Sequence, residues 1–106
     1  MGSNGKFACD VTQGERGAVI ALGGEIDLTA CDVLTQVFND ATDGSLSVVV
    51  DTSEVSFMDS SGLRCLLQLR LKCDSKHRNL RLRTPSGAVR KLLDVSGVER
   101  FFSIED

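Results

Sequence analysis

A run of β-branched residues near the middle of the chain limits the possible folds more than any other segment. Residues 46–51, LSVVVD, have the composition of a strand that is covered on both faces. Such strands are typical of parallel sheets, in which neighbouring strands are joined by crossover helices. The flanking segments are therefore expected to supply both further strands and the helices between them.

The segment before this run predicts a β-hairpin. Residues 7–11 alternate between apolar and polar side chains, and residues 18–22 are continuously apolar. Residues 14–17, GERG, form a turn between them. Gly23 and Gly24 are expected to end the second strand.

Apolar residues at helical spacing predict a first helix over residues 30–41. Thr29 is expected to be its N-cap, with Asp32 as the capping-box partner, and Gly44 to end it. A second helix is predicted to open at Asp59-Ser60-Ser61-Gly62, with Leu63, Leu66, Leu67 and Cys73 on its inner side.

The remaining segments continue the alternation of strand and helix. Residues 80–82 predict a short strand, and Thr84-Pro85-Ser86 breaks it and caps a third helix that Gly97 ends. Residues 99–104 are expected to form a last short strand. The predicted order is ββαβαβαβ: a single α/β domain with a mixed, mostly parallel sheet and helices mainly on one face. We expect a flexible leader over residues 1–5 and the domain over residues 6–106.

The composition favours a cytoplasmic protein without a membrane span. No apolar run approaches the roughly 18 residues that a span needs, and residues 1–6 contain no signal-peptide core. The four cysteines, Cys9, Cys31, Cys65 and Cys73, form no C-x-x-C pair, so a zinc site is not expected. On a helix, Cys65 and Cys73 would lie about 12 Å apart, too far for a disulfide. We interpret all four as reduced, half-buried thiols; a redox role for any of them stays open.

The charges are distributed unevenly along the chain. Residues 1–60 contain two basic and ten acidic residues, whereas residues 61–106 contain ten basic and five acidic residues. Such a split can orient a charged protein partner. The basic residues are spread over several predicted elements, and the chain has no Tyr or Trp for base stacking. Nucleic acid is therefore the less favoured partner.

The loop after the central strand is the candidate functional site. In parallel sheets, functional groups gather beyond the carboxyl ends of the strands. We expect the strand to end at Asp51 and the following loop to deliver Ser60, exposed, to the start of the second helix. A phosphate would be tolerated there, because helix N-termini accept anions. A purely structural role, with Ser60 as an N-cap, explains the residue equally well.

Three motifs show a resemblance to a known family. Residues 57–63, FMDSSGL, resemble the signature of anti-sigma-factor antagonists of the STAS-domain family. Residues 24–27, GEID, and residues 92–98, LLDVSGV, match two further motifs of that family. The resemblance covers about residues 7–104, with the motifs in the family's order and spacing, and it implies a STAS-like fold.

The resemblance also implies a mechanism. In such proteins the first serine of the Asp-Ser-Ser-Gly run is phosphorylated, which is Ser60 here. The unphosphorylated form binds an anti-sigma factor that is also a serine kinase, and a sigma factor is released. A PP2C-type phosphatase resets the switch. No cofactor is expected, since ATP and Mg²⁺ belong to the partner. The expected partner-binding residues are Asp27, Thr29, Asp59, Ser61, Gly62 and Arg64.

One position, Arg64, departs from the family pattern. The family commonly has a small residue where Arg64 stands, so Arg64 could select a partner, pair with the phosphate or be a solvated surface residue.

The sequence also bears on three alternative functions. A hydrolase is not expected, because Ser60 is not in a G-x-S-x-G elbow and the single histidine, His77, lies in a basic turn. A nucleotide-binding module is not expected either, because the chain lacks the Gly-rich phosphate loop that such modules contain. A STAS module of a stressosome, or of a lipid or anion transporter, remains the alternative.

Overall fold

The structure is a computed structural model, and it describes residues 7–106. Eight helices and strands and two short 3₁₀ turns follow one another along these residues. In chain order they are β1 (Phe7–Gly14), β2 (Gly17–Ile26), η2 (Leu28–Ala30), α1 (Cys31–Gly44), β3 (Ser47–Met58), α2 (Ser60–Ser75), β4 (Asn79–Arg83), α3 (Gly87–Ser96), η3 (Glu99–Phe101) and β5 (Ser103–Glu105). The predicted leader, residues 1–5, lies outside the described residues.

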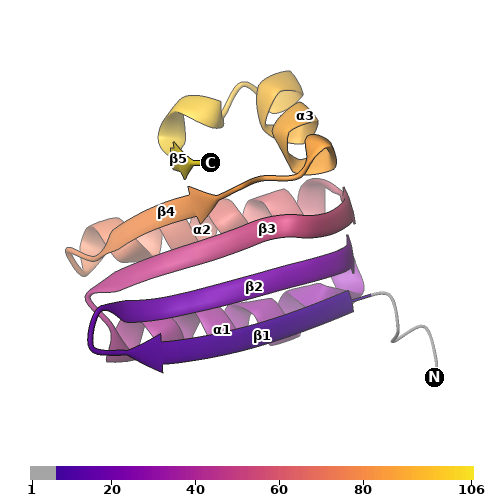
Figure 1. Cartoon of the computed structure of the whole chain (residues 1–106). Helices are drawn as coiled ribbons and strands as arrows, with labels where there is room; N and C mark the ends of the chain where they lie inside the picture. The colour runs from indigo at the N-terminus through magenta and orange to yellow at the C-terminus, as the bar shows by residue number, and fades with distance from the viewer. Residues whose placement is uncertain (1–6) are drawn as a thin grey trace.

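The five strands form one sheet in the order β1-β2-β3-β4-β5. β1 and β2 pair antiparallel as a hairpin, and the other neighbours are parallel (Figure 1). This confirms the predicted order ββαβαβαβ and the mixed, mostly parallel sheet. Because the strand order in the sheet follows the chain, residues distant in sequence lie toward opposite edges of the sheet.

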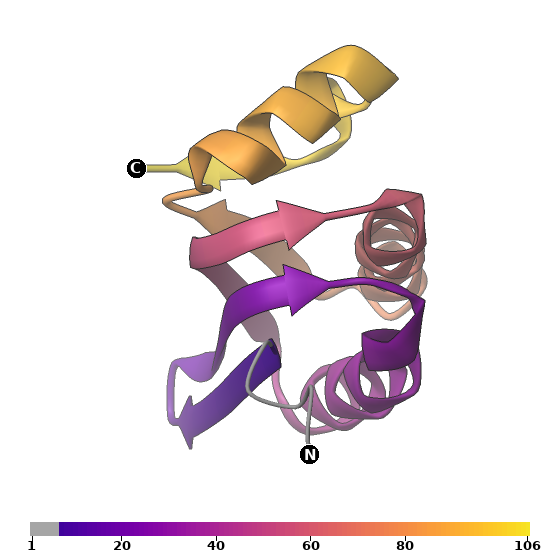
Figure 2. The ribbon, with the colours of Figure 1, turned by 90° about the vertical axis from the view of Figure 1, so that its right-hand side faces the viewer.

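Helices α1 and α2 cover one face of the sheet, while α3 lies beyond β4 at the other end of the strand order (Figures 1 and 2). The segment leading into α3 is attached to β3, because the Ser86 N–H donates to the Thr52 carbonyl over 3.2 Å. The prediction that the helices lie mainly on one face is therefore confirmed. None of the helices in residues 7–106 is long and apolar enough to cross a membrane.

The core lies between the sheet and these helices. It is built from side chains that are almost fully buried, among them Ile20, Val50, Leu66, Leu82 and Leu93. Val48 and Val50 of β3 are buried, but Val49 between them is only half-buried. The expectation that residues 46–51 are covered on both faces is therefore wrong, since α1 and α2 pack on one face only.

The two central strands are longer than predicted. β2 continues past Gly23 and Gly24 to Ile26, and β3 continues past Asp51 to Met58. Their pairing persists through two register shifts, at which β3 contains extra residues. These β-bulges interrupt the two-residue alternation that identifies a strand in a sequence. A Cβ at Gly23 would lie 3.2 Å from the Glu54 Cβ, so a glycine suits this close approach.

The end of the chain also differs in detail from the prediction. Residues 99–101 form the 3₁₀ turn η3, and only residues 103–105 pair as β5. Phe102 is buried, whereas Phe101 is 52% exposed. The strand expected over residues 99–104 is therefore shorter, because the chain turns at η3 to bring Phe102 into the core.

Candidate functional site at the ends of β2 and β3

The candidate site lies where the two central strands end side by side. Ile26, the last residue of β2, pairs with Met58, the last residue of β3. The Asp59 N–H then donates to the Ile26 carbonyl over 3.2 Å. The segments that follow both strands therefore start at the same edge of the sheet, as predicted for Asp27 and Ser60 (Figure 1).

Asp59 is the N-cap of α2. Its backbone is extended, and its Oδ1 accepts hydrogen bonds from the N–H groups of Ser61, at 2.9 Å, and Gly62, at 3.2 Å. Ser60 is the first residue of the helix proper. The interpretation of Ser60 as a mere N-cap is therefore wrong. A carboxylate also suits this position because it opposes the positive end of the helix dipole.

Ser60 is the accessible hydroxyl of the turn. It is exposed, and its side chain forms no hydrogen bond with any residue in the described part of the chain. Ser61 is half-buried, and Thr52 is fully buried with no partner for its Oγ1 among residues 7–106. Of these three hydroxyls, an enzyme acting on the folded protein meets Ser60 first.

Asp27 orders the neighbouring segment. Its Oδ1 accepts hydrogen bonds from the Thr29 N–H at 2.9 Å and the Thr29 hydroxyl at 2.6 Å. Asp27 thereby caps the 3₁₀ turn η2, and α1 starts only at Cys31. The prediction of Thr29 as N-cap with Asp32 as its partner is wrong, because η2 takes up the bend between β2 and α1. Asp27 and Thr29 nevertheless lie on the segment that borders the start of α2.

Gly62 lets α2 begin close to both strands. A Cβ at this position would lie 2.7 Å from the Met58 Cγ and 2.9 Å from the Ile26 Cγ2. Such distances are too short for carbon atoms, so a larger residue would push the first turn of α2 away from the strand ends. Gly62 is buried, and its structural role is to let the first turn of α2, which carries Ser60, lie against the ends of β2 and β3.

The comparison with protein families decides what this fold is. Residues 9–104 match the family described as "Mlab, STAS domain", which is nearly the whole chain. The chain belongs to the STAS-domain family. The comparison with curated proteins gives no match.

Solved structures resemble this STAS domain over most of their length. The unphosphorylated form of the anti-sigma factor antagonist SpoIIAA is 25% identical, with a TM-score of 0.78 over 93% of this chain and 89% of that chain. The phosphorylated form of Bacillus SpoIIAA is 24% identical, with a TM-score of 0.75 over 93% of this chain and 92% of that chain. An anti-sigma factor antagonist from Mycobacterium paratuberculosis is 23% identical, with a TM-score of 0.85 over 99% of this chain and 90% of that chain. The STAS-like fold predicted from the motifs is thus confirmed.

The rim of the STAS domain's candidate site contains apolar residues that the sequence analysis did not select. Leu28, on η2, is 71% exposed, and Phe57, near the end of β3, is 48% exposed. Large apolar residues this exposed beside a functional loop are typical of protein interfaces. The sequence offered a signal for both residues, since Leu28 directly follows the motif residue Asp27 and Phe57 directly precedes the motif residue Met58. Whether these side chains are exposed, however, depends on which way the strand ends face.

Arg64 adds a positive charge about one turn beyond Ser60. The residue is exposed and forms no ion pair with any of residues 7–106. Arg70, two turns further along α2, is by contrast paired with Asp74 at 3.2 Å. Arg64 is therefore free to meet a group brought by a partner.

Proposed function

We propose that this STAS domain is a cytoplasmic anti-sigma-factor antagonist that is switched by phosphorylation of Ser60. Its unphosphorylated form binds an anti-sigma factor with serine kinase activity and thereby releases a sigma factor. Phosphorylation of Ser60 switches this binding off, and a PP2C-type phosphatase restores it. The observation that carries the proposal is an exposed Ser60 hydroxyl without a hydrogen-bond partner among residues 7–106, in a chain whose fold is that of SpoIIAA in its unphosphorylated and phosphorylated forms.

The local electrostatics support a switch that acts on a partner. A phosphate adds about −1.5 to −2 charge at neutral pH. The N–H groups of Ser61 and Gly62, which could otherwise donate hydrogen bonds to this phosphate, already donate to the Asp59 carboxylate. The phosphate is therefore repelled by Asp59 and directed toward solvent, where a partner surface meets it.

The apolar rim explains why this charge would weaken binding. A partner that packs against Leu28 and Phe57 excludes water from the Ser60 turn. Placing a phosphate in such an interface costs desolvation free energy that a neutral hydroxyl does not. Each 1.4 kcal/mol or so of this cost lowers the affinity about tenfold. We assign the partner surface to this rim together with Asp27, Thr29, Asp59, Ser61 and Arg64, with Gly62 beneath it.

A catalytic function for Ser60 has no support in the geometry. His77 lies two residues beyond Ser75, the last residue of α2, whereas Ser60 is its first residue. At 1.5 Å per residue, the 16 residues of α2 separate them by about 24 Å. Residues 7–106 contain no group of three or more His, Cys, Asp and Glu side chains that could hold a metal ion. Ser60 therefore has no histidine base within reach.

The test compares binding of one partner to matched variants. The anti-sigma factor is first recovered with unphosphorylated protein and identified by mass spectrometry, and then titrated against wild type, Ser60→Ala, Ser60→Asp and protein carrying phosphoserine at position 60. We expect Ser60→Ala to bind like wild type and the phosphorylated protein to bind at least tenfold more weakly. Ser103→Asp, an equal charge on β5 at the edge of the sheet, is the control and should bind normally.

Undiminished binding by the phosphorylated protein would refute the switch, whereas a weak effect of Ser60→Asp alone would not, since one carboxylate replaces a phosphate poorly. The second candidate is a STAS module in a stressosome or in a lipid or anion transporter. The family description, which names Mlab, is the observation in its favour. If the chain is such a module, the same pull-down should recover a different partner, which would bind through the same rim.

A further inference from the structure

Two cysteines, Cys31 on α1 and Cys65 on α2, lie close to the Ser60 turn where the two helices pack together. Cys31 is the first residue of α1, and its Sγ lies 3.6 Å from the Ser61 carbonyl oxygen in the first turn of α2. Cys65 stands four residues after Ser61, one turn further along the same face of α2. The position of Cys31 against Ser61 therefore places its thiol next to the turn that carries Cys65.

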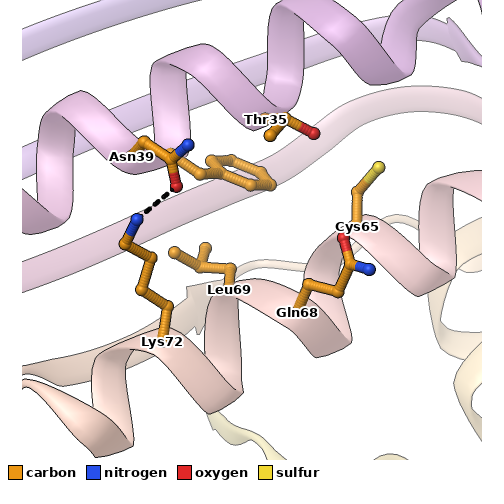
Figure 3. A pocket seen from close by; sticks show the side chains of 7 residues that line it. Thr35, Asn39, Cys65, Gln68, Leu69 and Lys72 are labelled. Atoms are coloured by element: carbon orange, nitrogen blue, oxygen red, sulfur yellow. Dashed lines mark hydrogen bonds between the residues drawn. The ribbon is translucent and has the colours of Figure 1, made fainter.

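The neighbours of Cys65 show that its side chain lies on the side of α2 that packs against α1. Figure 3 shows the Cys65 side chain extending from α2 toward α1, where Thr35 lies across from it. Thr35 is one turn after Cys31 on α1. Burial, and next to it the nearby Cys31 thiol, raise the pKa of Cys65 to about 12, and the nearby Thr35 hydroxyl opposes this rise. Both thiols are free; Cys31 is half-buried, and Cys65 is buried and lines a pocket between α1 and α2 together with Thr35 and Gln68.

We propose that Cys31 and Cys65 form a dithiol site that reacts with low-molecular-weight disulfides of the glutathione type and closes to an internal disulfide. The bond joins α1, just after the segment that carries Asp27, to the helix that carries Ser60. The same Cys31 Sγ also lies 3.7 Å from the Asp27 carbonyl oxygen, so oxidation alters a contact of both segments. In a reducing compartment such a disulfide is transient and regulatory rather than structural.

The reaction proceeds in two exchange steps. Cys31, the more accessible sulfur, loses its proton and attacks one sulfur of the small disulfide, which releases one small thiol and leaves a mixed disulfide. Cys65 then loses its proton and attacks the Cys31 sulfur, which releases the second small thiol. Two protein thiols are oxidised and one small disulfide is reduced to two thiols. Because Cys65 is protonated at neutral pH, the second step is the slower one.

The closing step requires a modest rearrangement. A disulfide has its sulfur atoms about 2.0 Å apart, so both side chains must turn toward each other for the bond to form. Cys9 on β1 and Cys73 near the end of α2 lie on other elements or several turns away. They serve as internal controls.

The test uses the full chain without any partner, so its outcome does not depend on the proposed function. Reduced protein is incubated with glutathione disulfide at pH 8 and followed by intact mass spectrometry under non-reducing conditions. We expect a transient adduct with one glutathione, followed by a species that lacks only two hydrogen atoms. Peptide mapping should join Cys31 to Cys65, and the melting temperature of the oxidised monomer should rise.

Variants make the assignment specific. Cys31→Ser should abolish both species, whereas Cys65→Ala should stop the reaction at a stable glutathione adduct on Cys31. Cys9→Ser and Cys73→Ala should react like wild type, and circular dichroism confirms that each variant is folded. A wild type that keeps four thiols, that stops at the adduct, or that links Cys9, Cys73 or two chains would overturn the proposal.

Discussion

The turn between β3 and α2 divides two tasks between adjacent residues. Asp59 satisfies the free N–H groups at the start of α2, so Ser60 is not needed for the helix. Ser60 keeps an exposed hydroxyl that makes no hydrogen bond within the described residues. A residue that does not stabilise the fold can be modified without unfolding the protein, which is what a phosphorylation switch requires.

At this scale we predict that the stability of α2 depends on Asp59 and not on Ser60. Asp59→Ala removes both capping hydrogen bonds and should lower the free energy of unfolding by about 0.5–2 kcal/mol. Ser60→Ala removes no internal contact and should change it by less than about 0.5 kcal/mol. Urea denaturation of the two variants measures the difference. An equal loss in both variants would show that Ser60 shares the capping role.

At the scale of the elements, the site depends on how closely α2 approaches the ends of β2 and β3. Gly62 permits this approach, because a side chain there would collide with Met58 and Ile26. The same close contact brings the Ser61 carbonyl to the Cys31 thiol and so joins α1 to the arrangement. The position of Ser60 relative to Asp27 is therefore a consequence of packing between elements.

The corresponding prediction compares two helical glycines near helix starts. Gly62→Ala should lower the free energy of unfolding by about 1–3 kcal/mol, because the added methyl overpacks the junction. Gly87→Ala, at the first residue of α3, adds a methyl with nothing within 4 Å and should be neutral or stabilise by up to about 1 kcal/mol. Thermal and urea denaturation of both variants test this. A stabilising Gly62→Ala would mean that the junction has spare room.

At the scale of the whole molecule, the strand order turns the charge asymmetry of the sequence into a spatial one. The acidic first half forms β1, β2, α1 and β3, and the basic second half forms α2, β4, α3 and β5. Ser60 stands at the boundary between the two halves. A phosphate on Ser60 therefore adds charge beside the acidic side, where it changes what a partner meets without disturbing the core.

We accordingly predict that phosphorylation leaves the fold intact. Protein with phosphoserine incorporated at position 60 should differ from wild type by less than about 4 °C in melting temperature, since about 1 kcal/mol corresponds to roughly 4–8 °C for a domain of this size. Amide chemical shifts should change mainly in residues 26–29 and 57–64. Changes that spread to β4 and β5 would indicate a rearrangement of the sheet and contradict a purely local switch.

Local patterns in the sequence were sufficient for the order and type of the elements. Alternation identified the hairpin, helical spacing identified all three helices, and Ser86 and Gly97 marked the ends of α3 correctly, with Gly97 in the left-handed region at φ 72°. These features depend on interactions between residues close in the chain, which a single sequence records. The family motifs likewise placed Ser60 at the start of α2, because their spacing is local.

Other features depended on contacts between distant segments and were decided only by the tertiary structure. β3 extends to Met58 because β2 pairs with it through two bulges, which no alternation in residues 52–58 reveals. Leu28 and Phe57 are exposed because both strand ends face solvent. The Cys31 thiol reaches the first turn of α2 because α1 and α2 pack side by side. The sequence alone thus determined which elements form and which residue types flank Ser60. Long-range packing, which depends on how the elements fit together, decided where the strands end, which surfaces stay open and which turn of α2 the Cys31 thiol contacts.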